Sequence, residues 1–90
     1  MNNSQADIFF DFSEEYLQER EVFLDYLQGE NWNKLNSENN WRKNFTQSLT
    51  TKEQFNIIKK EIELASKISK IKSIDYIVIS DEAVYYNKVD

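Results

Sequence analysis

TTKEQFNIIKKEIELASKISKIK, residues 50–72, is the stretch that decides the fold. Thr50 and Glu53 have the spacing of a capping box, in which a hydroxyl accepts from one orphan N–H and a carboxylate accepts from another. Apolar residues then recur at helical spacing over an arc of roughly 200°, wider than the stripe of an ordinary surface helix. They are Phe55, Ile57, Ile58, Ile62, Leu64, Ala65, Ile68 and Ile71. We therefore predict one long helix that contacts two neighbours.

One carboxylate, Glu61, lies inside this apolar arc, where burial without a partner is costly. A second candidate helix, Ser13–Gln28, carries Arg20 at the centre of its own apolar arc. Because ionisable side chains are seldom buried unpaired, we predict that Arg20 and Glu61 form an ion pair where the two helices meet. The alternative is that each side chain extends outward along its aliphatic stem to reach water.

The second candidate helix has start and stop signals of its own. Asp11 or Ser13 can cap its first turn, and the acidic residues that follow suit a helix N-terminus. Gly29, the only glycine of the chain, is a natural residue to end it. Its apolar arc consists of Tyr16, Leu17, Phe23, Leu24 and Leu27.

Strand signals lie near both ends of the chain. Ile74–Ile79 and Ala83–Tyr86 are rich in β-branched and aromatic residues and predict a hairpin with its turn at Ser80–Glu82. The first of these strands is apolar on both faces, which indicates a central strand. An isolated hairpin is only marginally stable, so Asp7–Phe12, with its alternating pattern, is the candidate third strand. The alternative is an extended lead-in that packs on the next helix; residues 1–6 are predicted to be frayed.

The middle of the chain is less regular. Residues 36–40 are polar and turn-like. Trp41, Phe45 and Leu49 then recur every four residues, which predicts a short helix over Ser37–Ser48.

Together these elements define the expected fold class. We predict a single α+β domain over residues 1–90, with two to three helices packed against a C-terminal antiparallel hairpin and Asp7–Phe12 as a third strand. Trp32 and Trp41 flank a polar loop. They are either core anchors, the commoner role for tryptophan, or a binding surface.

Composition argues against an enzyme. The chain has no Cys and no His, which removes thiolate chemistry, the commonest general base and the commonest ligand of transition metals. The acidic pairs Glu14–Glu15 and Asp81–Glu82 are explained by a helix start and a turn, and no phosphate loop is present. We predict no catalytic residue, no metal and no cofactor. The chain has no apolar run of about 20 residues and no signal-peptide pattern, so we expect a cytoplasmic protein.

Charge is unevenly distributed along the chain. Residues 1–30 hold eight acids and one base, giving −7, whereas residues 31–72 hold nine bases and four acids, giving +5. The lysine face of the long helix could contact phosphates. However, the sequence pI is about 4.7 and nucleic-acid-binding domains usually have a pI above ~9, so direct nucleic-acid binding is disfavoured.

The acidic N-terminal helix supplies the predicted binding surface. Acidic, polar and apolar residues share one flank, which suits a basic protein partner such as a nuclease. The residues are Glu15, Gln18, Glu19, Val22, Asp25, Tyr26 and Glu30. Alternatively this flank is merely solvated, or Val22 and Tyr26 belong to the core. We predict a non-enzymatic protein-binding module that acts as an inhibitor or immunity-type neutraliser. The alternative is an accessory subunit of a larger assembly, using the Trp32/Trp41 region or the free face of the sheet.

Overall fold

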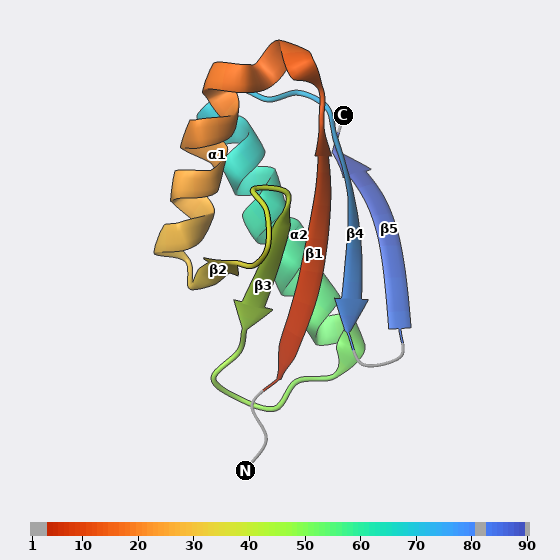
Figure 1. Cartoon of the computed structure of the whole chain (residues 1–90). Helices are drawn as coiled ribbons and strands as arrows, with labels where there is room; N and C mark the ends of the chain where they lie inside the picture. The colour runs from red at the N-terminus through yellow and green to blue at the C-terminus, as the bar shows by residue number, and fades with distance from the viewer. Residues whose placement is uncertain (1–3, 81–82, 90) are drawn as a thin grey trace.

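The computed structural model describes residues 4–80 and 83–89, in which two α-helices pack on one face of a five-stranded antiparallel sheet (Figure 1). The elements are β1 (Gln5–Phe12), a 3-10 turn η1 (Glu14–Tyr16), α1 (Leu17–Gly29), β2 (Trp32–Lys34), β3 (Asn40–Asn44), α2 (Thr51–Ser69), β4 (Ile74–Ser80) and β5 (Ala83–Val89). The predicted α+β class is confirmed, and the sheet is larger than the predicted three strands.

The strand order is β2-β3-β1-β4-β5, which places the first strand in the middle of the sheet. Each pair of neighbouring strands is antiparallel. The units β1-α1-β2 and β3-α2-β4 are therefore interleaved, each with a strand of the other between its two strands. This is the connectivity of the ferredoxin-like split β-α-β arrangement, to which β5 adds an outer strand.

The long helix α2 begins as predicted. The Glu53 N–H donates to Thr50 Oγ1 at 3.1 Å, and the Thr50 N–H donates to Glu53 Oε1 at 2.9 Å, which completes the capping box. The helix is followed by Lys70 in the left-handed conformation, with φ 68°. It contacts α1 on one flank, and on the other the Phe55 ring stacks on Tyr85 of β5 at 4.8 Å. The two predicted contacts of this helix are confirmed.

The strand predictions at both ends of the chain are also confirmed. In β1, Ile8, Phe10 and Phe12 are buried beneath the helices. β4 lies between β1 and β5, as its two apolar faces indicated. The prediction that residues 1–6 are frayed is wrong for the described part of this range, because Gln5 already belongs to β1 and Ser4 Oγ accepts from the Leu49 N–H at 3.1 Å. Residues 1–3 lie outside the described residues, as does most of the predicted 80–82 turn.

The predicted helix over residues 37–48 is wrong, because Asn40–Asn44 form strand β3, which pairs with β2 in a hairpin. Trp41, Lys43 and Phe45 alternate inward, so the spacing of the two aromatic residues fits a strand as well as a helix. Trp32 and Trp41 are only 2% and 1% exposed. Both are core anchors, and the predicted alternative of a binding surface at these tryptophans is wrong.

The end of α1 also differs from the prediction. Gly29 is the last residue of α1 and does not adopt a positive φ. The left-handed residue is Asn31, with φ 68°, just before β2. Asparagine tolerates this conformation better than most residues other than glycine, which explains how the chain turns here.

Tyr76 of β4 is buried in the core, and its Oη accepts from Asn87 Nδ2 at 3.0 Å. Burial raises the pKa of Tyr76 to about 12. Since an unfolded tyrosine titrates near 10, the unfolded state loses this proton first, and stability should fall as pH rises from about 10 to about 12. A phenolate absorbance titration should show a last step near pH 12 that is absent from Tyr76→Phe. A last step unchanged in the variant would contradict this assignment.

Candidate functional site

The charged cluster around Glu61 is structural. Trp32 Nε1 donates to Glu61 Oε1 at 2.7 Å, and Lys43 Nζ lies 3.0 Å from the same oxygen. Lys43 Nζ also donates to the backbone carbonyl of Glu30. The Lys43 and Glu61 side chains are 8% and 17% exposed. Because these charges are enclosed and satisfy one another, the cluster holds α2 to the β2–β3 hairpin and has no free group for a ligand.

The predicted ion pair between Arg20 and Glu61 is therefore wrong. Arg20 instead lies 3.8 Å from Glu38 and over the Phe12 ring, 5.7 Å from its centroid. The reason is that Lys43 of β3 points inward beneath α2 and pairs with Glu61 there. Glu61 is therefore already neutralised by a cation from the sheet, and Arg20 of α1 pairs elsewhere.

The predicted acidic face is divided by the structure. Glu15, Gln18, Val22 and Asp25 are exposed. Glu19 and Tyr26 are half-buried. Burial raises the pKa of Tyr26, and the negative charges of Glu30 and Glu61 raise it further, which places this phenol near α2. Glu30 lies just beyond α1 and is half-buried. The exposed surface thus consists of the outer side of α1 and the 3-10 turn.

The acidic residues of this surface have no ion-pair partner within the described residues. The ion pairs found there join Arg20 to Glu38, Arg42 to Asp7, and Lys43 to Glu61. None involves the carboxylates of the 3-10 turn or α1, which are Glu14, Glu15, Glu19, Glu21 and Asp25. The outer side of α1 therefore presents uncompensated negative charge.

Both helices also expose apolar side chains. The helices α1 and α2 pack side by side and run in opposite directions, and each leaves apolar side chains exposed (Figure 1). Val22, Leu64 and Ile68 are 46%, 47% and 52% exposed. The sequence places Leu64 and Ile68 in the apolar arc of the long helix, which we predicted to contact two neighbours. The apolar arc of α2 is wider than the surface that its neighbours cover. This width was the sequence signal that part of the arc would remain exposed.

The second exposed apolar surface is the sheet face opposite the helices, which no described element covers. Cross-strand pairing aligns Phe9 with Ile77 and Ile77 with Tyr86 in one row, and Ile79 with Val84 in the next. These five side chains are between 38% and 67% exposed. The sequence signal was the second apolar face of β4, which indicated a central strand but not an open face.

Polar contacts flank these rows. Arg42 Nε donates to Asp7 Oδ1 at 2.7 Å, and this hydrogen bond raises the pKa of Arg42. Tyr86 Oη donates to Asp75 Oδ1 at 2.8 Å, which raises the pKa of Tyr86. These paired groups border an apolar patch formed by Phe9, Ile77, Ile79, Val84 and Tyr86 on a sheet face that also carries polar residues.

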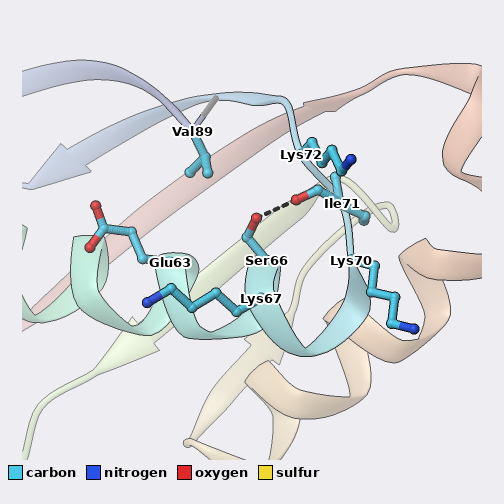
Figure 2. A pocket seen from close by; sticks show the side chains of 7 residues that line it. All are labelled: Glu63, Ser66, Lys67, Lys70, Ile71, Lys72 and Val89. Carbon is cyan, nitrogen blue, oxygen red and sulfur yellow. Dashed lines mark hydrogen bonds between the residues drawn. The ribbon is translucent and has the colours of Figure 1, made fainter.

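A groove of about 750 Å³ opens between the end of α2 and the end of β5 (Figure 2). It is lined by Glu63, Ser66, Lys67, Lys70, Ile71, Lys72 and Val89. Ser66 Oγ donates to the Ile71 carbonyl and so fixes the turn that follows α2. Cations near a helix C-terminus suit its dipole, which is one role of these lysines.

The described residues contain no helix long and apolar enough to cross a membrane. In residues 4–80 and 83–89, no group of three or more Asp or Glu side chains has the geometry to hold a metal ion. Comparisons with protein-family models, with curated proteins and with solved structures found no match. The functional argument therefore depends on the surfaces described above.

Proposed function

We propose that the protein is a non-enzymatic binding module that docks the outer side of α1 on a basic surface of a protein partner. By occupying that surface it acts as an inhibitor or an immunity-type neutraliser. The observation that carries this proposal is the uncompensated negative charge of the 3-10 turn and α1, on helices that also expose the apolar side chains of Val22, Leu64 and Ile68.

Interface physics supports this surface. Protein interfaces combine a desolvated apolar centre with a polar rim, and complementary charge accelerates the encounter of the partners. Here exposed Val22 and Leu64 supply apolar area, and Glu15 of the 3-10 turn and Asp25 of α1 supply charge. The whole chain has a net charge of −5, which adds to the attraction of a basic partner.

Charge reversal tests the proposal. Glu15→Lys combined with Asp25→Lys should weaken partner binding by roughly tenfold or more, because like charges would then face each other. Asp11→Lys combined with Glu63→Lys is the matched control, since both residues are exposed, lie off α1 and change the net charge equally. Affinity capture from the native cells with each variant, followed by mass spectrometry, should show a partner that the α1 variant loses and the control retains.

The same experiment can contradict the proposal. Equal capture of every partner by the wild type and both variants would exclude α1 as the docking surface. Equal loss of a partner from both variants would indicate a dependence on net charge alone.

A second candidate function is that of an accessory subunit which buries the exposed sheet face in a larger assembly. The aligned rows through Phe9, Ile77 and Tyr86, and through Ile79 and Val84, favour it, since exposed apolar patches mark interaction sites. Ile79→Thr combined with Val84→Thr keeps the strand propensity but reduces the apolar area. Loss of a partner from this variant, with retention by the α1 variant, would favour the accessory role.

A further inference from the structure

We propose that an extended acidic segment of a partner protein binds as an added strand along β5, with one side chain entering the groove beside Val89. This site uses different residues from the α1 surface and does not depend on it.

The edge of the sheet at β5 has free backbone groups. β5 pairs with β4 on one side, and no described strand pairs with its other side. It is seven residues long, whereas β2 at the opposite edge has three. Natural edges are usually protected by shortness, proline or charge. In β5 the only charged residue is Lys88 and there is no proline, so this edge can accept a further strand.

The groove lies where such a strand would direct its side chains. α2 covers β5 at the Phe55–Tyr85 stack but leaves the groove open near Val89. Figure 2 shows Glu63 and Ser66 on the side of α2 toward Val89, with Lys72 on the chain that leads into β4. Alternate residues of a strand point to the same face of a sheet. Every second side chain of an added strand would therefore point toward the helix layer, and one would reach this groove.

The charge of the groove selects the occupant. Three lysines, Lys67, Lys70 and Lys72, surround it, against one acid, Glu63. Their aliphatic stems and Val89 offer apolar contact, while the ammonium groups attract carboxylates. An extended segment that alternates β-branched and acidic residues suits both features, because its backbone can pair with the β5 edge and its acidic side chains can reach the lysines of the groove.

A second copy of this chain is a poorer occupant. Two β5 edges paired about a two-fold axis would place both helix layers on the same side of the joined sheet. The flank of α2 nearest β5 carries Lys59 and Lys70 against one acid, Glu63, so two such flanks would approach each other with like net charge. The resulting repulsion between like charges opposes this dimer.

A synthetic peptide pool tests the proposal on the full chain. Each fluorescent peptide has ten residues, with Val, Ile or Thr alternating with Asp or Glu. We expect saturable binding by fluorescence anisotropy and slowed amide exchange at alternate residues of β5. The same peptides with N-methyl groups on alternate amides should not bind, because they cannot pair with the edge. Peptides with Lys in place of the acids should bind roughly tenfold or more weakly.

Protein variants separate the groove from general charge. The triple variant Lys67→Glu, Lys70→Glu, Lys72→Glu should weaken binding of the acidic pool by roughly tenfold or more. The triple variant Lys34→Glu, Lys52→Glu, Lys60→Glu makes the same charge change at exposed lysines outside the groove and should retain binding. The proposal is overturned if no acidic peptide binds, if the N-methylated peptides bind equally well, or if both triple variants lose binding equally. If amide exchange in β5 slows without peptide as the protein concentration is raised, the β5 edge pairs with a second copy of the chain instead.

Discussion

Replacement of Phe10 by alanine is expected to lower the free energy of unfolding by about 4 kcal/mol. Phe10 lies at the centre of the aromatic core, with ring centroids 5.4 Å from Phe12, 5.3 Å from Phe23 and 5.9 Å from Trp32. The smaller side chain leaves a cavity that strands on both sides of β1 prevent from closing. For a domain of this size the melting temperature should fall by about 20 °C.

The control for this substitution is the neighbouring residue. Phe9→Ala, on the opposite side of β1, removes the same ring from a side chain that is 40% exposed, and should cost about 1 kcal/mol or less. Urea denaturation followed by tryptophan fluorescence measures both values. Similar losses in the two variants would contradict the alternation of β1 and the position of Phe10 in the core.

Replacement of Glu61 by alanine should lower the free energy of unfolding by about 3 kcal/mol, because it leaves a buried charge without its partner. In the variant, Lys43 would keep only the Glu30 carbonyl, and the Trp32 Nε1–H would lose its acceptor. The loss arises from desolvated groups rather than from lost packing, so added salt should restore little of it.

A double substitution distinguishes this cause from a simple loss of volume. Lys43→Met with Glu61→Leu removes both charges and keeps apolar bulk, and should be clearly more stable than Glu61→Ala alone. Chemical denaturation of Lys43→Met, of Glu61→Leu and of the double variant gives the coupling energy between the two residues. Strict additivity of the three free-energy changes would contradict the pairing of Lys43 with Glu61.

Local signals predicted those elements whose own residues determine them. The capping box of Thr50 and Glu53, the alternation of residues 7–12 and the β-branched runs of the final hairpin all correspond to observed elements. Each signal lies within a few neighbouring residues, so it can be recognised without knowledge of the tertiary structure.

The β2–β3 hairpin could not be predicted in this way. An inward lysine at position 43 hides the alternation of its strand, and it is tolerated there only because Glu61 comes from α2 to meet it. The same long-range pairing defeated the prediction for Arg20, since sequence distance does not show which cation a buried acid will meet. Prediction of the candidate site from sequence was limited for a similar reason. The exposure of Leu64, Ile68 and the sheet face depends on how far neighbouring elements extend.

The position of β1 in the middle of the sheet affects folding during synthesis as well as the stability of the folded domain. During translation β1 leaves the ribosome well before its sheet neighbour β4, because α1, β2, β3 and α2 lie between them in the chain. The two strands pair from Phe12 with Ile74 to Asp7 with Ile79. The nascent domain therefore carries an incomplete sheet until β4 has been synthesised. Pairing between residues so distant in sequence slows folding and prolongs the exposure of apolar strands, so this small domain depends on late closure by its C-terminal third.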